Sequence, residues 1–247
     1  MKSATITHAA LALLTAGMAL GGDSVENGRR VLTKGKGWSM DQAVVEDPTL
    51  PRVLLISDGA AFPHVVGRLR NRAYVDSWVS SYCQSERYNA VLAEVLLQGP
   101  YDVIHFNMGH HGFQKDNAGQ PRIPPDQFEQ LTKAFVEVMK SENPNARLIW
   151  SSATPVTLQA NPAELDPENN PTIIEHNRMA AKVMAEMNVP ANDLYGLMID
   201  RLNMRVNALM YNQQGNSIIG KACADAVLEV LPPERQQTPP TPAKPTK

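Results

Sequence analysis

The feature that most constrains the fold is a short apolar run that ends in a polar turn. Val53 to Ile56 are four consecutive apolar residues, and Ser57, Asp58 and Gly59 follow them. A run of this length that is apolar at every position is typical of a strand buried on both faces, as in the middle of a parallel sheet. Open α/β folds place their chemistry at the carboxyl ends of such strands. The residues after Ile56 are therefore the first candidates for a functional site.

Further strand-like runs alternate with helical patterns along the chain. Each helical segment has apolar residues three to four positions apart. The expected strands are 53–56, 74–79, 103–107, 148–152 and a short run at 192–195, and the expected helices are 88–97, 126–141, 172–187 and 217–231. This alternation indicates a parallel sheet covered by helices. We therefore expect an α/β fold, a three-layer αβα sandwich with a flavodoxin-like, doubly wound parallel sheet of five strands.

The two ends of the chain differ from this middle part. Residues 1–21 contain Lys2 and then a mostly apolar run from Ala9 to Leu20, which predicts a secretory signal peptide; an uncleaved anchor is the alternative. Residues 22–50 lack sustained periodicity and predict an exposed lead-in, and the proline-rich residues 232–247 predict a disordered tail. One folded domain is expected over 51–231, in a protein that is secreted or periplasmic and leaves the membrane after signal cleavage.

Composition narrows the classes of partner. The 23 Lys and Arg residues nearly balance the 25 Asp and Glu residues, and no long basic run occurs, which argues against nucleic acid and anionic membranes. A small-molecule or glycan ligand of low charge fits better, and no cofactor is expected. The two cysteines, Cys83 and Cys223, are expected to be unpaired thiols, although an oxidising compartment would allow a disulfide. The oligomeric state is left open.

Six segments taken together resemble the SGNH/GDSL hydrolase family, which includes the GDSL-like lipases and acylhydrolases. They are Pro51–Gly59, Tyr82–Ser85, Tyr101–His111, Leu148–Val156, His176–Ala180 and Asn192–Tyr195. The resemblance covers roughly residues 51–231 and implies the αβα fold. In that family a Gly-Asp-Ser triplet after the first strand supplies the serine nucleophile. An Asp-x-x-His segment before the last helix supplies the general base and the carboxylate that orients it.

This chain departs from the family pattern at three of those positions. Gly59 stands where the family has its nucleophilic serine, Met210 where it has the base, and Asn207 where it has the orienting carboxylate. A methionine accepts no proton near neutral pH, and an asparagine does not stabilise an imidazolium as a carboxylate does. The resemblance therefore implies a catalytically degenerate member of the family.

The positions that would hold an oxyanion are better preserved. Asp58 agrees with the family aspartate, and Asn107 matches the asparagine whose side chain donates to the oxyanion. Gln84 replaces a glycine whose backbone N–H joins the same site, and Gly59 directly follows Asp58 in the first segment. We therefore take Asp58, Gly59, Gln84 and Asn107 as an oxyanion-like binding set. A cap at the end of its strand is the alternative for Asn107.

Histidines near the expected carboxyl edge leave a second possibility open. Ser57 with an imidazole, for example that of His111, would form a rebuilt catalytic dyad. Other histidines expected at this edge are His64, His105 and His110. A zinc site needs three or four converging ligands, whereas adjacent histidines in an extended loop point apart, so no metal is expected. Ordinary loop histidines are the remaining interpretation.

Three functions follow from these residues. The first is a secreted SGNH/GDSL-fold protein that has lost ester hydrolysis and keeps a cleft for a carbohydrate or acylated ligand. The second is an active serine esterase or acetylesterase that uses Ser57 or a non-standard base. The third is a scaffold or partner-binding protein with a vestigial cleft. We adopt the first as the working interpretation because Gly59, Asn207 and Met210 lie in separate motifs.

Overall fold

The fold is built on one sheet of seven strands. The computed structural model describes residues 28–36, 38–57, 59–79, 85–107, 112, 119–120 and 122–231. The sheet order is β1-β2-β4-β3-β5-β6-β7. The strands are β1 (Arg30–Gly35), β2 (Trp38–Ala43), β3 (Arg52–Ser57), β4 (Tyr74–Val79), β5 (Val103–Phe106), β6 (Arg147–Ser151) and β7 (Ala191–Asn192).

The last five of these strands are parallel to one another. Their order in the sheet, β4-β3-β5-β6-β7, corresponds to the order 2-1-3-4-5 of flavodoxin-like folds. This confirms the predicted α/β class and the doubly wound arrangement. The predicted strand at 192–195 is much shorter than expected, because β7 ends at Asn192 and Asp193 caps a helix by accepting a hydrogen bond from the Gly196 amide.

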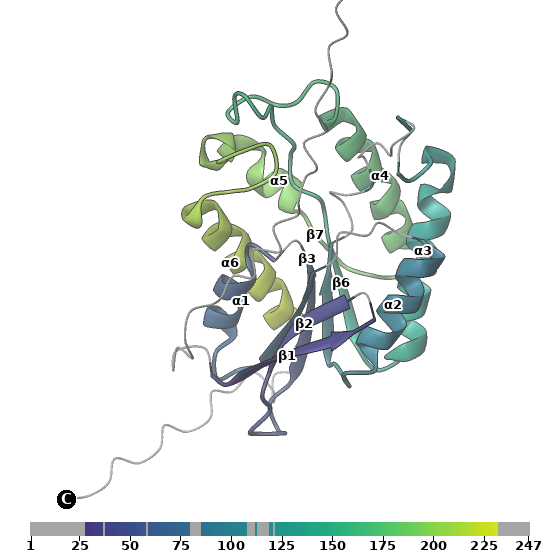
Figure 1. Cartoon of the computed structure of the whole chain (residues 1–247), viewed down its shortest axis with the longest axis vertical. Coiled ribbons are helices and arrows are strands. Elements are labelled where there is room, and N and C mark those ends of the chain that lie inside the picture. The colour runs from purple at the N-terminus through teal and green to yellow at the C-terminus, as the bar shows by residue number, and fades with distance from the viewer. Residues whose placement is uncertain are drawn as a thin grey trace, which may run out of the picture.

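Helices cover both faces of the sheet (Figure 1). The described helices are α1 (Phe62–Leu69), α2 (Glu86–Leu96), α3 (Phe128–Glu142), α4 (Asn170–Glu186), α5 (Leu194–Met198) and α6 (Gln213–Val230), with 3₁₀ turns η1 (Pro125–Gln127) and η2 (Ile199–Met204). Figure 1 shows α1 and α6 on one side and α2, α3 and α4 on the other. The four predicted helices are all present, each within a few residues of its expected bounds.

Two hydrophobic cores fill the spaces between these layers. Successive side chains of a strand point to opposite faces, so an apolar run contributes to both cores. In β3, Leu54 and Ile56 pack with α2, α3 and α4, whereas Val53 and Leu55 pack with α1 and α6. All four side chains are buried. The burial of this run on both faces is what places β3 at the centre of the sheet.

The hairpin β1–β2 differs from the sequence prediction. Residues 22–50 were expected to be an exposed lead-in, but β1 pairs with β2, and β2 continues the sheet by antiparallel pairing with β4 through Met40 and Trp78. The sheet is therefore mixed and has seven strands instead of five parallel ones. Few side chains of an edge hairpin are buried. Its sequence therefore lacks the regular apolar pattern from which strands are predicted.

A buried carboxylate fastens this hairpin to the parallel strands. Asp76 of β4 is completely buried. Its Oδ2 accepts hydrogen bonds from Arg52 Nη2 at 2.6 Å and from the Tyr101 hydroxyl at 3.1 Å, and its Oδ1 accepts one from the Ala43 amide at 2.9 Å. Burial, together with the neighbouring carboxylate, raises the pKa of Tyr101 far above its ordinary value. Asp76 thus joins β2, β3 and the start of β5.

The segments predicted at the two ends lie largely outside the described residues. Residues 1–21, predicted as a signal peptide, and residues 232–247, predicted as a tail, are not described. Across the described part of the chain, no helix combines the length and apolar character that a bilayer crossing requires. Cys223 is buried in α6, whereas Cys83 is not described.

Candidate functional site

The parallel strands bring the candidate residues to one edge of the sheet. The register pairs Ser57 with Val79, Ile56 with Phe106, Phe106 with Trp150, and Ser151 with Asn192. Ser57 and Asn107 therefore lie at the carboxyl ends of adjacent strands, where open α/β folds bind ligands. Asp58, Gln84 and His111 were predicted at this edge and lie outside the described residues.

The turn after β3 is built around Gly59. The Gly59 amide donates a hydrogen bond to Ser57 Oγ at 3.1 Å, and the Gly59 carbonyl accepts one from the Phe62 amide at 3.2 Å. The φ angle of Gly59 is +87°, and a Cβ placed there would lie 2.8 Å from Cγ2 of Val79. Both features exclude an ordinary side chain unless the turn or Val79 shifts. The position that matches the family nucleophile is thus one that glycine alone fits without strain.

Ser57 acts as a hydrogen-bond acceptor in this turn. Within the described ranges, no hydrogen bond connects Ser57 Oγ with an imidazole or a carboxylate. His64, one of the histidines expected nearby, lies in α1, where its Cβ faces the Gly220 backbone of α6. The pairing of Ser57 with His111 is not tested, since His111 is not described.

Asn107 connects the ends of two strands. Its amide nitrogen Nδ2 donates to the carbonyl oxygens of Ser151 and Ser152 at 3.1 and 3.0 Å, and its backbone amide donates to Ile56 at 2.9 Å. This is the geometry of the strand-end cap that we considered as the alternative to an oxyanion donor. The oxyanion role of Asn107 stays a prediction, and it would require the side chain to exchange these carbonyl oxygens for a ligand.

The loop that matches the Asp-x-x-His segment is organised by Asn207. Its Oδ1 accepts hydrogen bonds from the backbone amides of Leu209 and Met210 at 2.9 and 2.8 Å. The Val206 amide donates to the Met210 carbonyl at 2.9 Å, which closes the loop. The Met210 side chain is 50% exposed. Asn207 therefore has a structural role in this loop, and Met210 presents a thioether instead of an imidazole.

His105 lies in the interior of the sheet and not at its edge. It occupies the middle of β5, is buried, and its Nε2 lies 3.2 Å from Nδ2 of Asn192. Burial lowers the pKa of His105 to about 4, so the imidazole is neutral at physiological pH. The expectation that His105 belongs to an edge cluster is therefore wrong. The pattern of the strand could have shown this, because His105 shares its face with the buried Val103.

Several polar residues at this edge were not singled out from the sequence. Ser152 Oγ donates to Asp193 Oδ1 at 2.9 Å and accepts from the Tyr195 amide at 2.8 Å. Asn177 of α4 binds both the amide and the carbonyl of Ala153, at 2.8 and 2.9 Å. These bonds fix the chain after β6 where it passes the candidate site. No motif of the sequence signals them, since each joins residues far apart in the chain.

His176 of α4 is a second buried histidine. Its ring stacks on Phe128 with centroids 4.1 Å apart, and Gly112 packs against it. Burial lowers the pKa of His176 to about 4. In the described portion of the chain, no group of three or more His, Cys, Asp or Glu residues has the arrangement of a metal site.

Comparison with solved structures defines the fold family. The acetyl xylan esterase AlAXEase superposes with a TM-score of 0.58 at 15% identity, covering 71% of this chain and 99% of its own. The lipase/acylhydrolase from Enterococcus faecalis gives 0.56 at 16% identity, covering 72% and 95%. Axe2, an acetylxylan esterase from Geobacillus stearothermophilus, gives 0.56 at 12% identity, covering 70% and 91%. The chain therefore has the SGNH/GDSL hydrolase fold.

These identities establish the fold and nothing finer. No protein-family model matches the chain, and no curated protein matches it either. The chain spans nearly the whole length of the structures it resembles. Its activity must be argued from its own residues.

Proposed function

We propose that this chain is an exported SGNH/GDSL-fold protein that has lost serine-dependent ester hydrolysis and binds a carbohydrate or acylated ligand at the carboxyl edge of its sheet. The observation that supports this most directly is the turn at Gly59. The positive φ of Gly59 and the 2.8 Å approach that an added Cβ would make to Cγ2 of Val79 both disfavour a nucleophile at the matching position. A single substitution would not restore the serine without rearranging the turn.

The loop at Asn207 gives independent support. Acyl transfer needs a base that takes the proton of the nucleophile, and the base needs an orienting group. Here Asn207 is committed to two backbone amides, and Met210 has no proton acceptor. Triad residues act as one unit, so restoring only one of them would recover little activity.

The ligand class rests on the edge itself and on the names of similar structures. Asn107, Ser152 and Asn192 place amides and a hydroxyl along the strand ends, and a neutral hydroxylated ligand could bind them in exchange for their present protein partners. Two of the similar structures are acetyl xylan esterases by name. An acetylated oligosaccharide is therefore the ligand class that we propose.

An activity assay tests the loss of hydrolysis. The purified chain should neither hydrolyse p-nitrophenyl acetate above the buffer rate nor react with a fluorophosphonate probe, and Ser57→Ala should behave in the same way. Covalent labelling of the unmodified chain that disappears in Ser57→Ala would contradict the proposal and establish a serine esterase that uses Ser57.

A thermal-shift assay tests ligand binding separately. A ligand at 100 times its Kd stabilises the folded state by about 2.7 kcal/mol. We expect acetylated xylo-oligosaccharides to raise the Tm of the chain, and Met210→Glu to reduce the shift. Leu97→Glu is the matched control, because Leu97 is also exposed but lies at the end of α2, away from the carboxyl edge. Absence of a shift across a panel of acetylated and free glycans would favour the scaffold function.

A further inference from the structure

The outer edge of β1 has no pairing strand in the part of the chain that the structure describes. Of the strands that the structure describes, only β2 pairs with β1. In Figure 1 the β1–β2 hairpin crosses the front of the molecule, and β1 forms its outer border. An unpaired edge presents a row of backbone N–H and C=O groups that can bind another strand.

Two consecutive apolar side chains on this edge are exposed. Val31 is 49% exposed and Leu32 is 61% exposed. Neighbouring residues of a strand point to opposite faces, so both faces of β1 carry an uncovered apolar group. An added strand would cover Val31 on one face and Leu32 on the other. Edge strands that avoid association usually carry charged residues, prolines or bulges. The exposed Val31 and Leu32 of β1 are therefore unusual for an edge that binds nothing.

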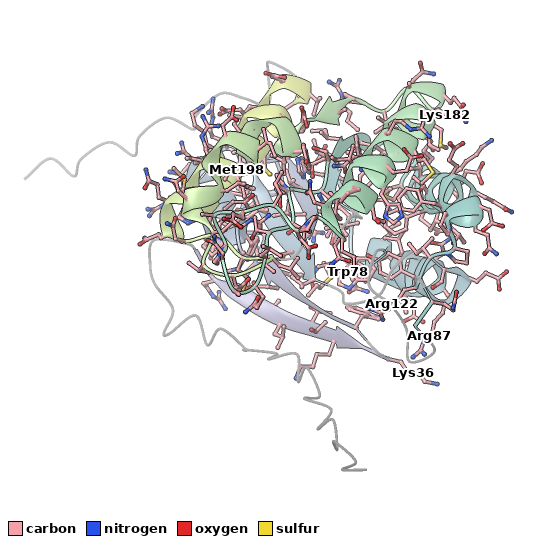
Figure 2. The ribbon with its side chains drawn as sticks, turned by 90° about the horizontal axis from the view of Figure 1, so that it is seen from above. Lys36, Trp78, Arg87, Arg122, Lys182 and Met198 are labelled. Carbon is pink, nitrogen blue, oxygen red and sulfur yellow. The ribbon has the colours of Figure 1, made fainter. Side chains whose placement is uncertain are left out.

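The edge also carries an excess of positive charge. Arg29, Lys34 and Lys36 are exposed, and no ion pair joins any of them to another residue in the described ranges. Arg30 differs, because its guanidinium pairs with Asp41 at 2.5 Å. Figure 2 shows Lys36 at the outer end of the hairpin. Three unpaired cations around two exposed apolar residues favour a partner that is both acidic and apolar.

We propose that β1 binds an extended segment of a partner protein that carries both acidic and apolar residues on each of its faces, so that the segment becomes an eighth strand of the sheet. In this mode the main-chain hydrogen bonds provide affinity and the alternate side chains provide specificity. The carboxylates of the segment face Arg29, Lys34 and Lys36, and its apolar side chains cover Val31 and Leu32.

A second copy of this chain fits the edge poorly. β1 carries no acidic residue, so in a pair of β1 strands the exposed cations of one copy meet cations and no carboxylate on the strand of the other. Like charges directly opposite one another destabilise strand pairing. The lysines therefore select against the chain itself while they attract an acidic strand.

Peptide binding tests the proposal. A short labelled peptide with a central pair of valines flanked by pairs of glutamates, so that each face of the strand carries both, should bind the full chain, measured by fluorescence anisotropy. Peptides with lysine in place of glutamate, or with a central proline, should bind at least about tenfold more weakly, because they lose the charge match or the strand. Isotope-edited infrared spectra of the bound peptide should show a β-sheet carbonyl band.

Variants locate the binding surface. Lys34→Glu should weaken binding of the acidic peptide by about tenfold or more. Lys133→Glu makes the same charge change at an exposed position of α3 and should leave the affinity for this peptide unchanged. Equal binding of the acidic, basic and proline peptides would overturn the proposal. So would a dimer that Lys34→Glu dissociates, or hydrogen-exchange protection of every amide from Arg30 to Lys34 in the free chain, since the edge would then be occupied already.

Discussion

At the scale of single residues, Gly59 and His105 show how a position in the fold changes the meaning of a residue. The resemblance to the hydrolase family predicts that Gly59 takes the place of a serine. In the structure it is a residue with positive φ, where an added Cβ would lie 2.8 Å from Cγ2 of Val79. His105 is a candidate acid or base in the sequence, but in the structure it is a buried neutral imidazole beside Asn192. The residue type alone determines neither the backbone φ angle nor the depth of burial.

The first prediction concerns Gly59→Ala. We expect a loss of roughly 2 to 3 kcal/mol of unfolding free energy, because the new Cβ meets both the positive φ and Val79. Gly119→Ala is the control, since Gly119 also has a positive φ but no atom lies within 4 Å of its added Cβ. Its cost should be about 1 kcal/mol. Urea unfolding measures both.

A double-mutant cycle separates the two causes. In a Val79→Ala background, Gly59→Ala should cost about as much as Gly119→Ala, because only the backbone strain is left. An unchanged cost of Gly59→Ala in that background would show that the contact with Val79 does not restrict this position.

The second prediction concerns His105 and pH. Its pKa is about 4 in the folded state against 6.5 in the unfolded state, so between these values only the unfolded state is protonated. The stability of the chain should therefore fall as pH falls from 6.5 to 4, by up to about 3 kcal/mol from this residue. The loss should level off below pH 4, where both states bind the proton.

Urea unfolding of His105→Gln at several pH values isolates this effect. Glutamine does not titrate, so the difference in unfolding free energy between the natural chain and the variant should change by up to about 3 kcal/mol between pH 7 and pH 3.5. The same difference at every pH would contradict the assignment.

At the scale of elements, the β1–β2 hairpin is the main departure from the sequence prediction. Apolar periodicity predicted all five parallel strands and four of the helices, because each of these elements buries a regular face. The hairpin instead depends on Asp76, a charged residue inside an apolar strand, and on Arg30. These are long-range contacts, which a local pattern does not contain.

The third prediction tests this attachment. Asp76→Asn keeps the shape of the side chain but leaves Arg52 without its carboxylate, and removing one member of a buried ion pair costs about 3 to 5 kcal/mol. Asp225→Asn, which breaks an exposed pair with Lys221 on α6, should cost less than about 0.5 kcal/mol. Chemical denaturation compares the two variants.

Hydrogen exchange shows which part of the sheet Asp76→Asn destabilises. In Asp76→Asn the amides of β2, including that of Ala43, should exchange faster than those of β5 and β6, because Ala43 donates directly to Asp76. Uniform acceleration across the sheet would mean that Asp76 stabilises the whole core instead of the hairpin.

At the scale of the whole molecule, the fourth prediction concerns export. Residues 1–21 have the charge and apolar run of a signal peptide. When the full chain is produced in a bacterium with a periplasm, intact-mass measurement should find a periplasmic product that begins close to Gly22. A full-length product in the membrane fraction would support the uncleaved anchor instead.

The sequence by itself determined the α/β class and the central position of β3, because these depend on the local order of apolar residues. Only the tertiary structure decided that Gly59 must be glycine, that Asn107 joins two strand ends, and that an edge hairpin widens the sheet. Each of these depends on atoms that the fold brings together from distant parts of the chain. Because the interior is closely packed, those atoms limit which side chains a position can accept.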